Sequence, residues 1–463
     1  MEPNAFSKYW REYVYAFSAT LSLFAGGACF SWTSPTLPLL MDESQERPIT
    51  ADEGSWIAAL LILTSGISPI PTIYVVDRLG RKWTLLLSTF PSIAGWIIVI
   101  FDITPEWLYV SRLLSGINYG VIYTVIPMYL GEIASKEVRG SVGILITVMA
   151  KAGILMTYSI GPYLPIVTHA CVQLAIPIIF LLTFFWSPES PYYLVLRNRK
   201  EEAERSLQRF RGRYDVKEEL ASIIDVVSYE QQNAGSFAEL FQTRGNRRGV
   251  ISVVAMCSAM QLCGSQAVLA YSQQIFEEAD GILDPKLATI LLGFMQLAAA
   301  ILASIIVDKV GRRPLLILSS CGVSLMCCVI GTYFFIKEYL EMDMQNLTWL
   351  PIILIIVYIV VYNIGLSTVS FALIGELFPT NVKAYTSSLA MSIIGLLAFA
   401  VTKMYQIISD GIGTYSAYWI FSFCATIFSI VIIIYVPETK GKTLAQIQID
   451  VNNRQHKTEK ISN

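Results

Sequence analysis

Long apolar stretches alternate with short charged ones along all 463 residues of the chain. Each apolar stretch is about 20 residues long, which is enough to cross a bilayer as an α-helix. The pattern therefore predicts an all-α membrane protein with twelve spanning helices. The predicted spans are residues 13–38, 55–76, 84–101, 107–131, 141–162, 168–187, 249–276, 287–307, 314–336, 349–375, 385–408 and 415–436.

One short charged signature occurs twice. Residues 77–82 have the sequence Asp-Arg-Leu-Gly-Arg-Lys, and residues 308–313 have Asp-Lys-Val-Gly-Arg-Arg. Each copy follows the second predicted span of its half. Two copies at matching places predict a duplicated membrane protein with two six-helix halves. Membrane transporters are often built from such repeats, with the substrate site between the halves.

The repeat divides the chain into four expected parts. A six-helix half over 1–187 is followed by a charged segment over 188–248, a second six-helix half over 249–439 and a tail over 440–463. The 188–248 segment is periodic in Leu, Phe and Ile, which favours short amphipathic helices. A simple linker is the alternative, although a disordered spacer is usually poorer in these residues.

The basic residues predict the orientation of the spans. Lys and Arg gather in the loops on one side of the predicted bundle, and the positive-inside rule places those loops and both termini in the cytosol. The opposite loops carry acids such as Asp42 and Glu278. They also carry the sequon Asn346-Leu347-Thr348, which predicts glycosylation at Asn346. We expect a multi-pass protein of the plasma membrane.

Composition agrees with a bilayer protein and gives no sign of an enzyme. Hydrophobic residues make up 54% of the chain and charged residues 15%, against roughly 25% charged in soluble domains. The eight cysteines lie in apolar spans without metal-ligand spacing, and there are only two histidines. We expect no cofactor, no metal and no nucleic-acid partner. A small molecule and the lipid bilayer are the expected partners, and no protein partner is evident.

Acids and bases recur together at the predicted cytosolic helix ends. After each signature comes a further pair, Glu132 with Arg139 and Glu376 with Lys383. Such pairs can close the inner face in one state and must break in another. Orientation by positive charge is the alternative, but it leaves the acids unexplained. The predicted gating network consists of Asp77, Arg81, Glu132, Arg139, Asp308, Arg312, Glu376 and Lys383.

Several motifs together resemble the sugar porter family of the major facilitator superfamily. They are Pro-Met-Tyr-Leu-Gly-Glu at 127–132 with Arg139-Gly140, Pro-Glu-Ser-Pro at 188–191 and Pro-Glu-Thr-Lys-Gly-Lys at 437–442. Within the family the chain looks most similar to the insect facilitated trehalose transporters, through residues 31–35 and 376–383. The resemblance implies facilitated sugar transport by alternating access.

The resemblance also implies positions that contact the sugar. In the seventh span, Gln261 matches the family pattern and Gln266 replaces its Asn; in the eighth, Gln296 replaces an Asn. The family's tenth-span pattern is Gly-Pro-x-Pro-x-Pro-Trp. Residues 365–371 keep only the glycine of that pattern and have Phe371 in place of Trp. In the fifth span, Thr147 aligns with a Gln of the family. Amides bind hydroxyls and aromatic faces stack on sugar rings. Interhelical hydrogen bonding is the alternative role for the glutamines.

Lys151 is an unusual cation near the middle of the fifth predicted span. A lysine at that depth usually faces a cavity or a partner. It lies one helical turn beyond Thr147 on the same face, so one hypothesis is a cavity-lining donor to substrate. The alternative is a lysine that snorkels along its helix or is satisfied by backbone carbonyls.

The predicted mechanism is uniport, because no carboxylate occurs between Glu12 and Asp42 in the first span. Relatives that couple sugar to protons carry an acid there. Two alternatives remain at this stage. One is a proton-coupled sugar symporter, and the other is a non-transporting sugar sensor that kept the fold, which the altered tenth-span pattern favours.

Overall fold

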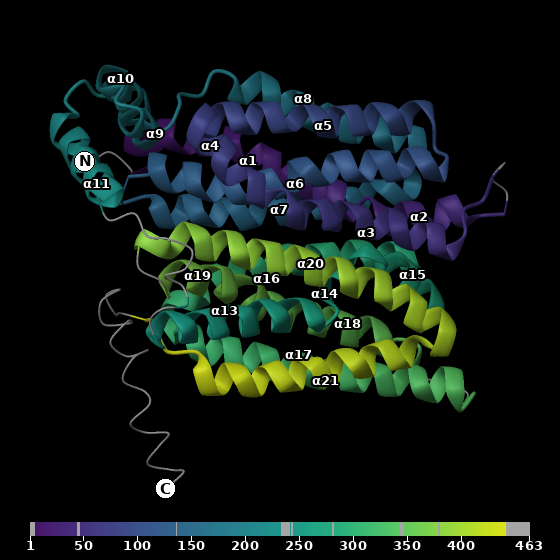
Figure 1. Cartoon of the computed structure of the whole chain (residues 1–463). Coiled ribbons are helices and arrows are strands. Elements are labelled where there is room, and N and C mark those ends of the chain that lie inside the picture. The colour runs from purple at the N-terminus through teal and green to yellow at the C-terminus, as the bar shows by residue number, and fades with distance from the viewer. Residues whose placement is uncertain are drawn as a thin grey trace, which may run out of the picture. The chain divides into compact units, whose positions relative to one another are not determined.

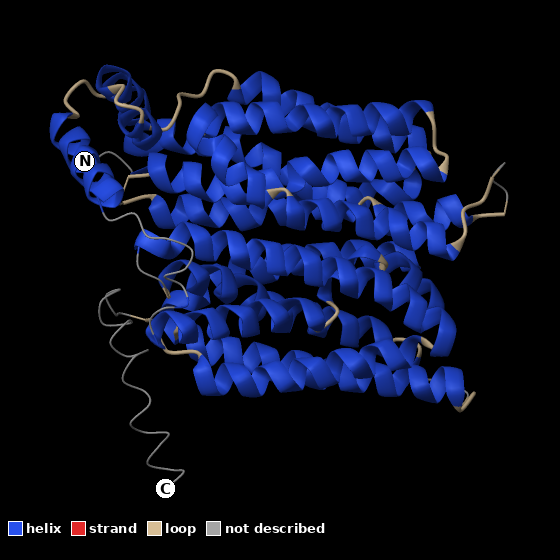
Figure 2. Ribbon diagram, in the orientation of Figure 1, coloured by secondary structure: helices blue, strands red, loops and turns tan. Residues whose placement is uncertain are grey.

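The computed structural model describes residues 5–43, 47–135, 137–232, 241, 244–279, 282–342, 347–377 and 380–440. Helices account for all regular secondary structure in these residues (Figure 2). The chain divides into two compact units, Met1–Asn233 and Ala234–Asn463.

Unit 1 is a bundle of helices with a group of shorter helices at one end (Figure 1). Its elements are α1 (Ala5–Ser31), α2 (Thr33–Met41), α3 (Ala51–Ile67), α4 (Pro69–Leu79), α5 (Arg81–Phe101), α6 (Pro105–Ile133), α7 (Arg139–Ile160), η1 (Gly161–Tyr163), α8 (Ile166–Phe184), α9 (Pro191–Leu196), α10 (Lys200–Arg211) and α11 (Lys217–Gln232).

Unit 2 repeats the bundle. Its elements are α13 (Arg244–Leu262), α14 (Ser265–Ala270), α15 (Ser272–Ala279), α16 (Pro285–Val310), α17 (Arg312–Phe334), η2 (Phe335–Tyr339), α18 (Leu350–Tyr362), η4 (Asn363–Ser367), α19 (Thr368–Glu376), α20 (Thr380–Ile412) and α21 (Thr414–Tyr435). Two of these, η2 and η4, are π-helical turns.

The described residues contain eleven helical segments that are long and apolar enough to cross a membrane. The pair α3 and α4, bent by 50° at Ser68, makes a twelfth if it counts as one span. Every predicted span overlaps one of these segments, so the all-α fold with twelve spans is confirmed. Figure 1 shows the spans of each unit running alongside one another.

Several spans are interrupted rather than continuous. The second bends by 50° between α3 and α4, the seventh breaks at Gly264 where φ is +87°, and the tenth contains the π turn η4. Broken backbone inside a membrane is tolerated only where protein or a water-filled cavity covers it. The interruptions therefore mark the interior of the bundles as the region of interest.

The outer surface is apolar, as lipid requires. Phe101, Leu182, Leu318 and Phe423 are each more than 65% exposed. In a water-soluble protein such a surface would promote association, whereas in a bilayer it faces hydrocarbon. The charged segment predicted over 188–248 contributes α9, α10 and α11, of which α10 buries Ala203, Leu207 and Phe210 on one face.

Candidate functional site

The two charged signatures form the same local structure in both units. Gly80 separates α4 from α5 and Gly311 separates α16 from α17, with φ of +93° and +106°. L-residues with side chains rarely adopt these angles, so glycine is required at both turns. The base that follows each glycine then begins a new helix.

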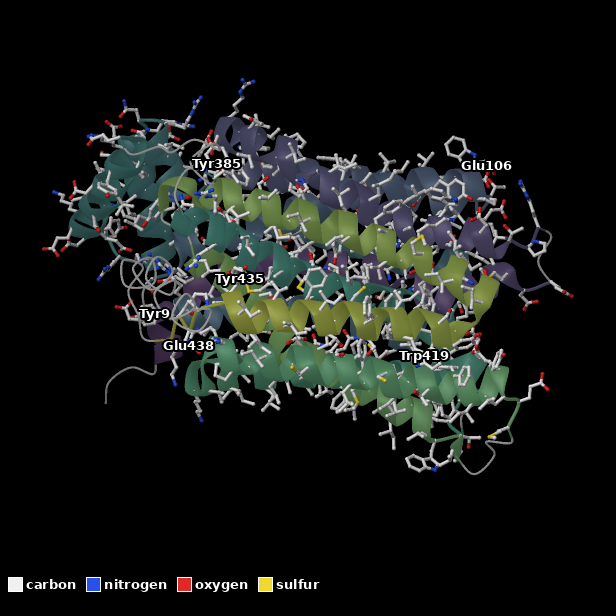
Figure 3. The ribbon with its side chains drawn as sticks, turned by 60° about the horizontal axis from the view of Figure 1, so that its bottom comes forward. Tyr9, Glu106, Tyr385, Trp419, Tyr435 and Glu438 are labelled. Carbon is white, nitrogen blue, oxygen red and sulfur yellow. The ribbon has the colours of Figure 1, made fainter. Side chains whose placement is uncertain are left out.

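A carboxylate from a distant motif caps each of these new helices. Glu189 accepts hydrogen bonds from the backbone N–H groups of Arg81 and Lys82, at 3.1 Å each. Glu438 accepts from those of Arg312 and Arg313, also at 3.1 Å. Figure 3 shows Glu438 just beyond Tyr435, at one end of α21, whereas Trp419 lies near the other end of that helix. The Pro-Glu motifs thus satisfy helix N-termini, where anionic groups are favoured.

The two caps differ in their electrostatics. Burial raises the pKa of the Glu189 carboxyl above its ordinary value, against the opposing effect of the N–H groups bonded to it. Burial also acts on Glu438, but there the N–H groups, including those of Lys440 and Thr439, outweigh it and lower the pKa. The same backbone arrangement therefore disfavours the ionised form of Glu189 in unit 1 and favours the ionised form of Glu438 in unit 2.

In unit 1 the signature also forms a buried ion pair. The Arg81 guanidinium donates to Glu132 through Nε and Nη2, at 2.8–3.1 Å. Asp77, which is exposed, lies 3.7 Å from Arg81, and the Ser190 hydroxyl donates to Glu132. The structure thus brings together Asp77, Arg81 and Glu132 of the predicted network.

Glu132 pairs with Arg81 rather than with Arg139 in this structure. Arg139 begins α7 and is exposed, and no ion pair to it occurs among the described residues. In unit 2, Arg312 donates its backbone N–H to Glu438 and is half-buried. The side chains of Asp308, Glu376 and Lys383, and the whole of Asn346, lie outside the described part of the chain.

A second buried charge cluster joins α10 to the bundle of unit 1. Arg211 contacts Glu12 at 3.0 Å and Glu219 at 2.6 Å, and it donates to the carbonyl of Ile133 at 2.8 Å. Burial opposes the charge of Arg211, but the two carboxylates outweigh it and raise its pKa. The sequence analysis missed this anchor, because its partners are far apart in the chain.

Of the predicted sugar contacts, Gln261 is the most informative. It is fully buried on α13, and neither its amide oxygen nor its nitrogen has a hydrogen-bond partner among the described residues. An unsatisfied buried amide costs about 1–3 kcal/mol. Gln296 on α16 is also fully buried, Gln266 on α14 is half-buried, and Phe371 on α19 is 44% exposed.

Asn363 is a polar residue that the sequence analysis did not select. It lies in the π turn η4, is buried, and donates to the carbonyl of Ile359 at 2.8 Å. Its amide oxygen has no partner among the described residues. Both α13 and α16 contact η4, so the turn packs against the helices that carry Gln261 and Gln296. An Asn inside an apolar span was the available signal.

In unit 1 the predicted contacts Thr147 and Lys151 lie on α7, and both are half-buried. A further buried cation was not predicted. Arg112 on α6 donates to the carbonyls of Ile57 and Cys29, at 3.2 and 2.9 Å. Its guanidinium also lies over the ring of Trp32 at 5.6 Å. No carboxylate pairs with Arg112 among the described residues.

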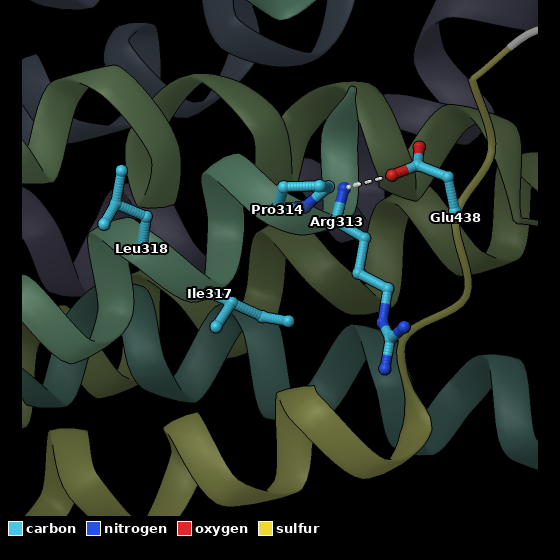
Figure 4. Close-up of a pocket in the computed structure, with 5 residues that line it drawn as sticks. All are labelled: Arg313, Pro314, Ile317, Leu318 and Glu438. Atoms are coloured by element: carbon cyan, nitrogen blue, oxygen red, sulfur yellow. Dashed lines mark hydrogen bonds between the residues drawn. The ribbon is translucent and has the colours of Figure 1, made fainter. Parts of the chain in front are cut away.

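A surface cavity of about 590 Å³ lies at the signature end of unit 2 (Figure 4). It is lined by Arg313, Pro314, Ile317, Leu318 and Glu438. The hydrogen bond from the backbone N–H of Arg313 to the Glu438 carboxylate lies at one edge of the cavity. None of the predicted sugar contacts is among its lining residues. The described residues contain no group of three or more His, Cys, Asp or Glu side chains able to hold a metal.

Residues 16–451 match the family described as sugar (and other) transporter. The chain is 31% identical to the facilitated trehalose transporter Tret1 of Apis mellifera ligustica, over 98% of this chain and 91% of that protein. It is also 31% identical to the Tret1 of Anopheles gambiae, but spans only 58% of that longer protein.

The fold is similar to that of solved transporters. The partially occluded, inward-open xylose transporter XylE from E. coli superposes with a TM-score of 0.78, at 20% identity, over 94% of this chain and all of that one. A second structure, the major facilitator superfamily proton:xylose symporter XylE bound to 6-bromo-6-deoxy-D-glucose, gives a TM-score of 0.77 at 20% identity, over 96% of this chain and 99% of that one. At this identity the likeness extends to the fold.

Proposed function

Since the chain belongs to the sugar transporter family of the major facilitator superfamily, we propose that it is a facilitative uniporter for a mono- or disaccharide such as glucose or trehalose. It works by alternating access, moving sugar down its gradient. The substrate choice follows the names of its relatives, which are facilitated trehalose transporters.

The observation that carries this proposal is Gln261. A fully buried amide with no partner at either atom among the described residues is poorly satisfied unless a polar ligand reaches it. Sugar hydroxyls both donate and accept, so one ring can serve the oxygen and the nitrogen together. Asn363 offers a second buried oxygen on an element that contacts α13. Gln266, Gln296 and Phe371 complete the proposed contacts in unit 2.

Uniport is favoured over proton symport by the surroundings of Arg112. A proton-coupled mechanism needs a protonatable group near the substrate path, and a buried cation is a natural partner for one. Here the guanidinium is held by two backbone carbonyls and the Trp32 ring. The first span provides no carboxylate between Glu12 and Asp42. Transport should therefore be electrically silent.

The proposed setting is the plasma membrane, with both termini and the signature ends of the helices in the cytosol. The distribution of Lys and Arg between loops supports this orientation. Asn346 is then extracellular and a glycosylation site. The predicted gating network, led by the buried Arg81–Glu132 pair, then lies at the cytosolic face. Breaking that pair is one step of opening inward.

An uptake screen in oocytes tests the proposal. Labelled mono- and disaccharides, including trehalose, should enter down their gradient, without a current and without sensitivity to a protonophore. A proton current that follows sugar addition would contradict uniport and favour the symporter. Normal surface expression with no uptake of any sugar, but with sugar binding, would favour the sensor.

Gln261→Ala should raise the half-saturation constant about five- to hundred-fold, because a bound hydroxyl loses its partner. The matched control is Gln406→Ala. Gln406 is also a buried glutamine of unit 2, but its nitrogen donates to Asp410 at 2.8 Å, and only its oxygen has no partner among the described residues. The control should leave the half-saturation constant unchanged, and equal effects in both variants would remove Gln261 from the site.

In unit 1 the proposed sugar contacts are Thr147 and Lys151, which are hydrogen-bond donors one helical turn apart on α7. Lys151→Met should change the preference among sugars without reducing the amount of protein at the surface. A cysteine at 151 should react with a small water-borne thiol reagent. Normal selectivity together with an unreactive cysteine would assign the lysine a structural role.

A further inference from the structure

A single π turn, η4, interrupts the tenth span between α18 and α19. A π turn holds one more residue than an α turn, so its backbone carbonyls and amides are displaced from their α-helical partners. Such turns inside α-helices occur frequently at functional sites. In a membrane each displaced group needs another partner, because no bulk water reaches it.

The partner comes from a neighbouring helix. The hydroxyl of Ser319 on α17 accepts a hydrogen bond from the backbone N–H of Leu366, at 2.9 Å, and donates to the carbonyl of Val361, at 2.7 Å. Residues 361 and 366 are five apart, which is the spacing of a π-helical bond. Ser319 thus lies between the two groups that such a bond would join. It is itself 2% exposed.

The packing brings η4 directly against α17 at this hydroxyl. Gly365 lies so close to α17 that a Cβ there would overlap the Leu315 carbonyl and the Ser319 side chain. Leu366, which is fully buried, follows this glycine. In the sugar porter pattern that residue is a proline, which has no N–H to satisfy. A leucine at 366 has one, and Ser319 bonds to it.

We propose that Ser319 is a positioning residue for substrate binding, because its hydroxyl holds η4 in the π form. Without it the segment relaxes toward a continuous α-helix. An α turn holds one residue fewer than a π turn, so this change would rotate the part of the helix that follows η4 by about 100°. That rotation would turn the side chains of Ser370 and Phe371 away from their present directions and shift Asn363 within the turn. The role of Ser319 in substrate binding rests on the proposed function, whereas its bond to η4 does not.

The test compares Ser319→Ala with Ser320→Ala in the full chain. Ser320 is the matched control, because it is equally buried and its hydroxyl donates to the carbonyl of Ile317 in its own helix, at 3.1 Å, and to no other helix among the described residues. Hydrogen exchange measured by mass spectrometry reports on the Leu366 amide without any substrate. Ser319→Ala should speed exchange in the peptide over 361–368 at least about fivefold, while the control leaves it unchanged.

Sugar uptake then separates positioning from simple stability. Ser319→Ala should raise the half-saturation constant at least about fivefold, with unchanged surface expression, and the control should not. Faster exchange with an unchanged half-saturation constant would overturn the positioning role. Unchanged exchange would overturn the hydroxyl bridge itself. If the wild type carries no sugar, the proposed function fails, and the exchange comparison still decides whether Ser319 holds the turn.

A second variant covers the case in which Ser319→Ala does not reach the surface. Adding Leu366→Pro removes the N–H that the alanine leaves unsatisfied. The double variant Ser319→Ala/Leu366→Pro should then recover surface expression relative to Ser319→Ala alone. Failure of this rescue would mean that the Leu366 amide is not what Ser319 satisfies.

Discussion

The signature ends of the two units share a backbone arrangement but differ in their electrostatics. In each, a glycine with positive φ ends one helix, and a glutamate from a Pro-Glu motif caps the next. Burial dominates at Glu189 and raises its pKa, whereas the N–H groups bonded to Glu438 dominate and lower its pKa. The duplicated motif therefore specifies the geometry of the cap, and the depth of burial specifies its charge preference.

This difference follows from what covers each end. Glu189 is followed by α9 and α10, and the hydroxyl of Ser206 on α10 donates to its backbone carbonyl. The buried Arg81–Glu132 pair lies beside it. The chain after Glu189 supplies one further backbone N–H group, from Ser190, whereas the chain after Glu438 supplies two, from Thr439 and Lys440. The helices that cover Glu189 exclude water from its carboxylate. At Glu438, backbone N–H groups bond to the carboxylate in place of water.

The largest expected effect comes from Glu132→Gln. It leaves the Arg81 charge buried without its bidentate partner, with Asp77 at 3.7 Å and the more distant charge of Glu189 as the remaining anions. Breaking a buried pair in this way costs about 3–5 kcal/mol. The melting temperature of the detergent-solubilised protein should fall clearly.

Asp77→Asn is the matched control for that experiment. It removes a carboxylate that contacts the same guanidinium, but Asp77 is 59% exposed. Exposed ion pairs contribute about 1 kcal/mol or less. Equal losses of stability in the two variants would show that the burial of Glu132 does not make its ion pair with Arg81 stronger than that of the exposed Asp77.

A smaller effect is expected from removing the caps. Glu189→Ala and Glu438→Ala each leave two helix N-terminal amides without their side-chain acceptor. Loss of such a cap costs about 0.5–2 kcal/mol. The two losses should be similar in thermal unfolding, because each carboxylate accepts from the first two backbone N–H groups of its helix at 3.1 Å. A loss at only one site would mean that the shared backbone arrangement is not stabilising in both units.

The smallest effect is the pH response of the two caps, which should have opposite signs. An unfolded glutamate titrates near about pH 4.3. Glu438 has a lowered pKa, so its contribution is present above that pH and is lost as the pH falls. Glu189 has a raised pKa, so the folded state binds its proton more readily, and stability declines as the pH rises from about 4.3 through the raised value.

Thermal unfolding across this pH range measures both slopes. Glu438→Gln should reduce the loss of stability in acid, and Glu189→Gln should flatten the decline at higher pH. Each change should amount to about 1 kcal/mol or less, since neither carboxyl is fully buried. Slopes of the same sign in both variants would contradict the contrast drawn between the two ends.

Much of the fold follows from local sequence. A run of about 20 apolar residues has few alternatives to a spanning helix, because lipid leaves no other partner for its backbone. The paired signatures likewise predicted the repeat, since glycine at 80 and 311 is needed wherever the backbone turns with positive φ. Gln261 was chosen from the family pattern, and the structure places it in a fully buried position.

The contacts of the charged and polar groups were decided by tertiary structure. The sequence paired Glu132 with the nearby Arg139, but its partner is Arg81, 51 positions away. Ser319 reaches Leu366 across 47 positions, and Arg211 reaches the Ile133 carbonyl across 78. The sequence alone therefore determined which segments are helices and where the two signature turns lie, because those depend on neighbouring residues. Which side chains meet depends on how the helices pack, so only the tertiary structure decided the ion pairs, the anchor of α10 and the serine that holds the π turn.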